Sequence, residues 1–186
     1  GGKEEPMRIV RKDKGITFVE ADLNNMGVSL ATLGKLSEAI GCFDKILKSD
    51  PADARAWKNK GSALARLGRP SEAIACYDTA LELKPEDAEA WAYKGSALTE
   101  LGKSTEALAC YDRALAFNPG SVEVWINRGL ILSRSGRFAQ ADECYDKALG
   151  LDPRNADAWA NKGVALVNMG KLSETIECCD TALKID

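Results

Sequence analysis

The tryptophans of this chain recur with a fixed step. Trp57, Trp91, Trp125 and Trp159 are all that it has, and each stands 34 residues after the one before. Such a period predicts a repeat protein, in which each unit is one supersecondary element that cannot bury its apolar side alone. With Trp at position 4, five repeats align: 20–53, 54–87, 88–121, 122–155 and 156–186.

Within a repeat, the residues predict two helices joined by a tight turn. N-cap residue types precede the first helix at Asp53, Asp87, Ser121 and Asn155. A proline two residues before each of them stops the preceding helix. Glycine at position 15 ends the first helix, and Ser or Thr at position 18 opens the second in four of the repeats. Each helix should have about 13 residues, and stacked pairs should form a solenoid with a continuous core.

A glycine also recurs in the middle of the first helix, at position 8. Glycine there costs about 1 kcal/mol relative to alanine, so a repeated one needs a compensating cause. We expect close approach of the partner helix, with the small residue at position 20 opposite each glycine.

The pattern Trp-x-x-x-Gly, followed by Ala, Tyr or Phe, Ala and Pro, resembles the tetratricopeptide repeat over residues 20–186. The resemblance implies an all-α fold, a right-handed superhelix of about ten antiparallel helices. The last repeat departs from the family pattern, because Thr175 replaces the small residue at position 20 and Cys179 replaces the aromatic at position 24.

Two charged columns suggest contacts between repeats. Aspartate occupies position 25 of every repeat, and a basic residue occupies position 7 of repeats two to five. We predict ion pairs between neighbouring repeats, although a solvated charged face without specific pairing is the alternative. The predicted pairs are Asp44–Lys60, Asp78–Lys94, Asp112–Arg128 and Asp146–Lys162.

By resemblance, the first helices line a concave groove that takes peptides or extended segments. Position 6 resembles an asparagine ladder, and an amide can both donate to and accept from a peptide backbone; asparagines that only cap local groups or meet water are the alternative. We expect a ligand with acidic groups near repeat two and apolar groups near repeats four and five. The candidate residues are Asn25, Asn59, Tyr93, Asn127 and Asn161 at position 6, with Arg55, Lys58, Arg66, Glu89, Ile126, Leu130 and Arg134.

Composition argues against catalysis. The chain has no histidine, which removes imidazole metal sites and histidine acid–base chemistry. The six cysteines are expected to be free structural thiols, because equivalent positions of stacked repeats lie too far apart for disulfides. We therefore expect no catalytic residues, no metal and no cofactor. The net charge of −3 favours no nucleic-acid partner, and the absence of a long apolar run predicts no membrane span.

The leading hypothesis is a non-catalytic, cytoplasmic scaffold for protein–protein interactions. The alternative is a substrate-recognition arm of a larger enzyme such as a glycosyltransferase. Residues 1–19 are expected to be a tag remnant, Gly1-Gly2, followed by a flexible lead-in. The last helix presents Ile176, Cys179 and Leu183 without a polar capping helix after it, so end-to-end self-association is also expected.

Overall fold

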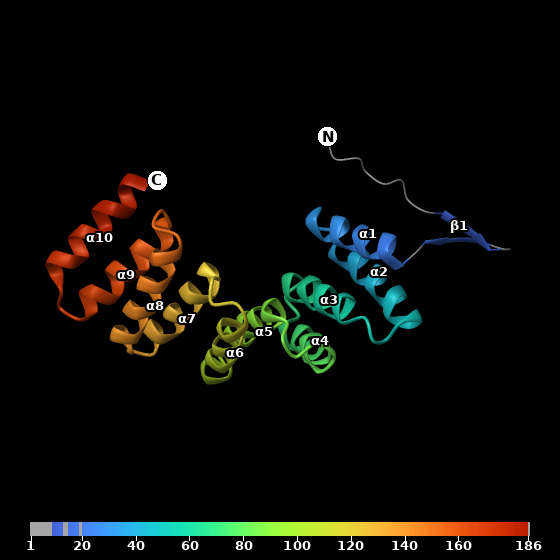
Figure 1. Cartoon of the computed structure of the whole chain (residues 1–186), viewed down its shortest axis with the longest axis horizontal. Helices are drawn as coiled ribbons and strands as arrows, with labels where there is room; N and C mark the ends of the chain where they lie inside the picture. Colours follow the sequence, from blue (N-terminus) through green and yellow to red (C-terminus); the bar gives the residue numbers. More distant parts are fainter. Residues whose placement is uncertain (1–8, 13–14, 19, 186) are drawn as a thin grey trace. The chain divides into compact units, whose positions relative to one another are not determined.

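The computed structural model describes residues 9–12, 15–18 and 20–185. The described part contains ten α-helices, one antiparallel pair in each repeat, which confirms the all-α repeat fold (Figure 1). The helices are α1 (Glu20–Thr32), α2 (Leu36–Ser49), α3 (Ala54–Arg66), α4 (Pro70–Leu83), α5 (Ala88–Glu100), α6 (Ser104–Phe117), α7 (Val122–Arg134), α8 (Phe138–Leu151), α9 (Ala156–Asn168) and α10 (Leu172–Ile185).

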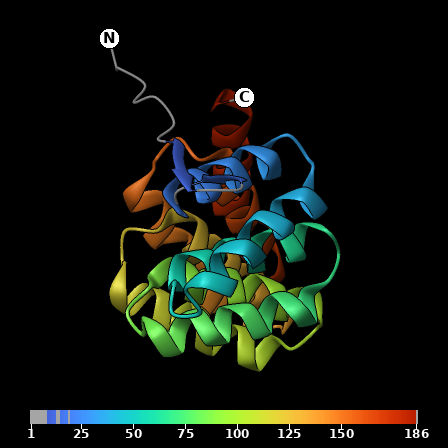
Figure 2. The same cartoon turned by 90° about the vertical axis from the view of Figure 1, so that its right-hand side faces the viewer.

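The chain divides into two compact units, residues 1–85 with α1–α4 and residues 86–186 with α5–α10. In each unit, every helix packs on the helix that follows it, as α3 and α4 do in Figures 1 and 2. In the second unit the first helices of neighbouring repeats also touch, α5 against α7 and α7 against α9. This places the first helices of the second unit in one layer.

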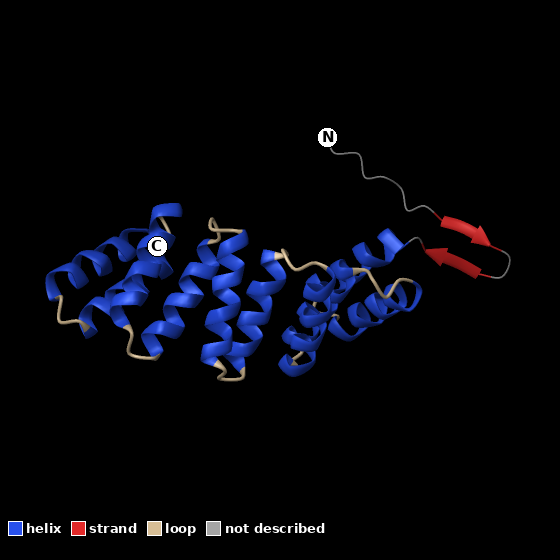
Figure 3. Cartoon of the chain, turned by 60° about the horizontal axis from the view of Figure 1, so that its bottom comes forward, coloured by secondary structure: helices blue, strands red, loops and turns tan. Residues whose placement is uncertain are grey.

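A β-hairpin lies within the stretch that was expected to be a flexible lead-in. Strand β1 (Ile9–Lys12) pairs antiparallel with β2 (Gly15–Phe18), with Ile9 opposite Phe18 (Figure 3). Both strands carry β-branched residues, which favour extended backbone. Residues 9–12 and 15–18 of the expected lead-in thus form a hairpin, while the tag remnant Gly1-Gly2 lies outside the described part.

Helix ends follow the sequence signals. The side chain of Asp53 accepts a hydrogen bond from the Ala56 amide at 2.9 Å, and Asp87, Ser121 and Asn155 cap α5, α7 and α9 in the same way. The position-15 glycines have φ between 72° and 79°, the left-handed conformation that ends a helix at low cost. In the four repeats with Ser or Thr at position 18, the second helix begins one residue before it, so that residue lies in the first turn.

The mid-helix glycines are explained by an aromatic ring. A Cβ atom on Gly61 would lie 2.6 Å from Cε1 of Tyr77, at position 24 of the same repeat. The atoms nearest to this Cβ belong to the ring, which reaches across the helix pair, rather than to the small residue at position 20. Equivalent contacts occur at Gly27–Phe43, Gly95–Tyr111 and Gly129–Tyr145. Only the glycine provides the space that the ring fills.

The tryptophan and proline columns are linked to each other. The indole Nε1–H of Trp57 donates to the carbonyl oxygen of Pro51 at 2.9 Å, and Trp125 and Trp159 bind Pro119 and Pro153 in the same way at 3.0 Å. Each of these three rings packs against a cluster of buried residues. The indole N–H of each of these tryptophans therefore holds the loop that precedes the repeat, and the ring covers the buried cluster.

The predicted ion pairs between repeats form where one compact unit contains both partners. Lys60 lies 2.6 Å from Asp44, Arg128 lies 2.8 Å from Asp112, and Lys162 contacts Asp146. These three pairs are confirmed, and the charged columns are not merely solvated. The fourth, Asp78–Lys94, would join the two units and stays a prediction.

Candidate peptide-binding groove

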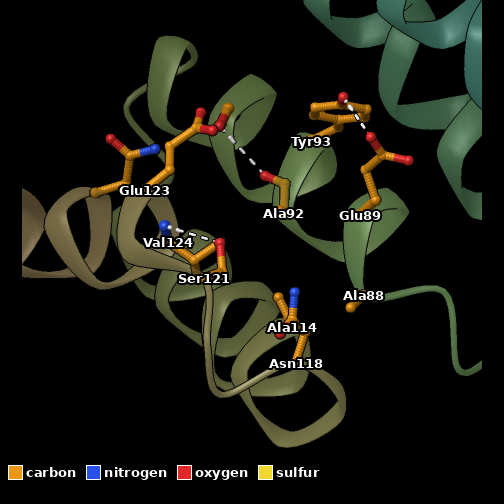
Figure 4. A pocket seen from close by; sticks show the side chains of 11 residues that line it. Ala88, Glu89, Ala92, Tyr93, Ala114, Asn118, Ser121, Glu123 and Val124 are labelled. Atoms are coloured by element: carbon orange, nitrogen blue, oxygen red, sulfur yellow. Dashed lines mark hydrogen bonds between the residues drawn. The ribbon is translucent and has the colours of Figure 1, made fainter. Parts of the chain in front are cut away.

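The second unit has a cavity between α5 and α7, of about 280 Å³. Glu89, Tyr93 and Ser96 line it from α5, and Glu123 and Asn127 line it from α7 (Figure 4). The neighbouring second helix, α6, contributes Ala114. Three of the residues predicted from the groove columns, Glu89, Tyr93 and Asn127, thus meet at one place.

Tyr93 is held by its neighbour on the same helix. Its hydroxyl donates to Oε1 of Glu89 at 2.8 Å, one helical turn away. Burial raises the pKa of Tyr93 to about 12, and the charges of Glu89 and Glu123 add to the effect because they disfavour the phenolate. The phenol therefore stays protonated near neutral pH.

A second cavity, of about 490 Å³, lies between α7 and α9. The aliphatic residues Ile126 and Leu130 line it, one helical turn apart on α7. Asn127 and Asn161 line it from neighbouring repeats. The predicted apolar and amide groove residues of repeats four and five are therefore close together.

The amides at position 6 do not all have the same surroundings. In the first unit, Asn59 Nδ2 donates to Oδ1 of Asn24 at 2.9 Å, and Asn24 is only 5% exposed. Asn25 is exposed. In the described part of the chain, the side chains of Asn127 and Asn161 hydrogen-bond no protein group, which leaves both amides available to a ligand in the second unit.

The remaining candidate residues do not line these two cavities. Arg55 and Arg66 are exposed on α3, and Lys58 of the same helix is half-buried. Arg134 is exposed at the last position of α7. The expected basic patch of repeat two and its acidic ligand stay predictions.

The sequence reasoning missed part of the acidic lining. Glu123 and Asp157 stand at position 2, the position of Glu89, and both line the second cavity together with Asp152. The 34-residue step from Glu89 to Glu123 and Asp157 was the available signal. On its own this step is a weak signal, because acidic residues in the first turn of a helix are common.

The six cysteines are free, and five of them are buried. Burial raises the pKa of Cys76 and Cys144, even though Arg128 donates to Cys144 Sγ at 3.0 Å. Thiols with a raised pKa are poor nucleophiles at neutral pH.

The described residues contain no cluster of three or more side chains suited to a metal ion. None of the helices described is long and apolar enough to cross a bilayer.

Comparison with known proteins identifies the repeat. Models of the tetratricopeptide repeat match residues 24–87 and 59–122, residues 94–160, and residues 156–186. No curated protein matches the chain significantly.

Solved structures share the fold. A crystal structure of MamA is 26% identical, with a TM-score of 0.80 over 86% of this chain and 93% of that one. MamA from Desulfovibrio magneticus RS-1 is 21% identical, with a TM-score of 0.82 over 89% and 94%. YrrB, described as a TPR protein with an unusual peptide-binding site, is 24% identical, with a TM-score of 0.75 over 90% and 87%. The chain belongs to the tetratricopeptide repeat family.

Proposed function

We propose that this protein is a non-catalytic interaction scaffold that binds an extended peptide segment of a partner protein along α5, α7 and α9. The family and the solved neighbours support a role in protein interaction. The observation that carries the peptide-binding proposal is the pair of amides, Asn127 and Asn161, that line the cavities without a protein partner.

The chemistry of these amides suits a peptide main chain. Each carboxamide offers one acceptor oxygen and two N–H donors, the complement of a backbone N–H and C=O. Since the two residues occupy the same position of neighbouring repeats, they can bind two separate peptide groups of one extended segment. Such contacts hold the segment without reading its side chains.

The expected location is the cytoplasm. The six free thiols suit a reducing compartment, where disulfides are rare. A recognition arm of a larger enzyme would use the same groove, so the experiment below tests the groove for either role.

The test is selection of peptides from a phage-displayed random library, followed by fluorescence polarisation with the selected peptides. Replacing both amides, in Asn127→Ala/Asn161→Ala, should weaken binding at least about fivefold, because each lost hydrogen bond is worth about 0.5–1.5 kcal/mol. The matched control is Gln140→Ala, an exposed amide on α8 outside both cavities.

The control should bind like the wild type, and thermal unfolding should show that all variants stay folded. Selection of no peptide would overturn the proposal. Equal affinity of the wild type and the double variant would also overturn it.

A further inference from the structure

Each of the first helices of the second unit carries a carboxylate at the same position of its repeat. Glu89, Glu123 and Asp157 occupy position 2 of α5, α7 and α9, and all three are exposed. Glu89 and Glu123 line the first cavity, while Glu123, Asp157 and Asp152 line the second. Among the described residues lining either cavity, there is no lysine or arginine.

Helix formation does not require these carboxylates. An acidic residue in the first turn does stabilise a helix through its dipole. However, α3 has Arg55 at the same position and no acidic residue in its first turn, and it forms the same 13-residue helix behind the cap Asp53. Stabilisation of the helix end therefore does not by itself explain the carboxylates of α5, α7 and α9, which are candidates for binding a ligand.

Two of these carboxylates lack a cation of the protein. In the part of the chain that the structure describes, Glu123 and Asp157 form no salt bridge. The aspartates at position 25 differ, because Asp112 and Asp146 pair with basic residues of the next repeat. A positive charge in the groove would therefore not need to displace an existing partner of Glu123 or Asp157.

The negative charge of neighbouring helices converges at the first cavity. Tyr93 hydrogen-bonds Glu89 of its own helix, and Glu123 approaches from α7 (Figure 4). Besides burial, both charges raise the pKa of this phenol, so both carboxylates act at the same point. A cavity with walls of low dielectric constant strengthens such a field.

Aliphatic surface lies beside these charges. Ile126 and Leu130 line the second cavity. On α9, Val164 is 56% exposed and Val167 is 47% exposed, at groove positions 9 and 12. A ligand that matches this groove must therefore offer both positive and apolar groups.

We infer that the groove of α5, α7 and α9 selects an extended peptide that carries lysine or arginine side chains alternating with aliphatic ones. The basic side chains meet Glu89, Glu123 and Asp157, and the aliphatic ones pack on Ile126 and Leu130. This inference rests on the proposed function, because it specifies which peptide the same groove takes.

The test uses two synthetic probe peptides, acetylated and amidated at their ends. The basic probe is Lys-Leu-Lys-Val-Lys-Leu-Lys, and the acidic probe has Glu in place of each Lys. Isothermal titration with the whole chain should show at least about tenfold tighter binding of the basic probe, and its affinity should fall as salt is added.

The groove variant is Glu123→Gln/Asp157→Asn. It should bind the basic probe about three- to tenfold more weakly than the wild type and with a flatter salt dependence, since exposed charge pairs are each worth up to about 1 kcal/mol. The matched control is Glu143→Gln/Glu177→Gln, which removes the same charge from position 22 of α8 and α10, outside both cavities. The control should bind like the wild type.

With the two probe peptides, either of two results would overturn the inference. One is an acidic probe that binds as tightly as the basic one. The other is equal weakening in the groove and control variants, which would show that only net charge matters. If selected library peptides lose binding in Asn127→Ala/Asn161→Ala but contain no basic residues, the inference fails and the proposed function stands. If no peptide is selected, both fail.

Discussion

The ring of Tyr145 fills the space that a side chain on Gly129 would need. A Cβ atom on Gly129 would lie 2.6 Å from Cε1 of this ring and 2.9 Å from Cζ, closer than real Cβ atoms come to other atoms. Tyr145 is fully buried, so it has no room to move away. The last repeat lacks the ring: the atom nearest to a Cβ on Gly163 is Cys179 Sγ, at 3.4 Å.

This difference predicts opposite effects of one substitution. Gly129→Ala should destabilise the protein by about 1–2 kcal/mol, because overpacking outweighs the better helix propensity of alanine. Gly163→Ala should stabilise it by up to about 1 kcal/mol, since alanine fits there. Urea unfolding followed by circular dichroism measures both changes, and two changes of the same sign would contradict the explanation.

The lysine at position 7 of the last repeat should matter more for stability than an exposed lysine, because it contacts two carboxylates. Lys162 contacts Asp146 and lies 3.5 Å from Asp142, whose side chain is only 18% exposed. Lys162→Met should therefore cost about 1–3 kcal/mol of unfolding free energy, because the buried carboxylate oxygen of Asp142 loses the cation beside it.

Lys171→Met is the matched control. Lys171 pairs with Glu174, and both side chains are about half exposed. Its removal should change the unfolding free energy by less than about 0.5 kcal/mol. Equal changes in the two variants would show that the pairing between repeats adds nothing to stability.

The pKa of Tyr93 measures how strongly burial and the neighbouring carboxylates act on a group in the first cavity. Its pKa of about 12, against the ordinary 10, should be visible by NMR of tyrosine labelled with ¹³C. Because folding raises this pKa, the stability that the phenol contributes is full below pH 10 and is lost as the pH rises towards 12. Glu89→Gln should lower the pKa, since the hydrogen-bonded charge is gone. A pKa that stays the same in this variant would contradict the assignment.

The end face of α10 predicts weak self-association. Leu149 in α8 is 7% exposed, but Leu183, at the same position of α10, is 78% exposed. Sedimentation velocity of the wild type should show larger species as the concentration increases. Leu183→Glu should abolish them, whereas Leu151→Glu, an exposed leucine of α8, should not. Sedimentation of the wild type that is independent of concentration would refute end-to-end association.

Much of the fold could be predicted because its signals recur in register. Asp53 and its equivalents cap as expected, and three ion pairs followed from comparing two columns. The aromatic ring that contacts the mid-helix glycine was not predicted. The small size of the residue at position 20 suggested a contact there, but the ring at position 24 is long enough to reach the glycine. Spacing cannot show how far a side chain extends.

The site was predictable only in part. The columns identified Tyr93 and Asn127 as neighbours, and both line one cavity. They could not show that Asn24 is buried beside Asn59, or that Asp152 of a loop joins the groove lining. These facts depend on how loops and adjacent helices meet in three dimensions.

The substitution of Cys179 for an aromatic residue has a practical consequence. Five of the thiols are inside the protein, and Cys179 is the exposed one. A maleimide dye or nitroxide added to the native protein should therefore attach at Cys179 alone, with no need to mutate the other cysteines. The natural chain thus provides a site-specific label on α10 for fluorescence or spin-resonance measurements.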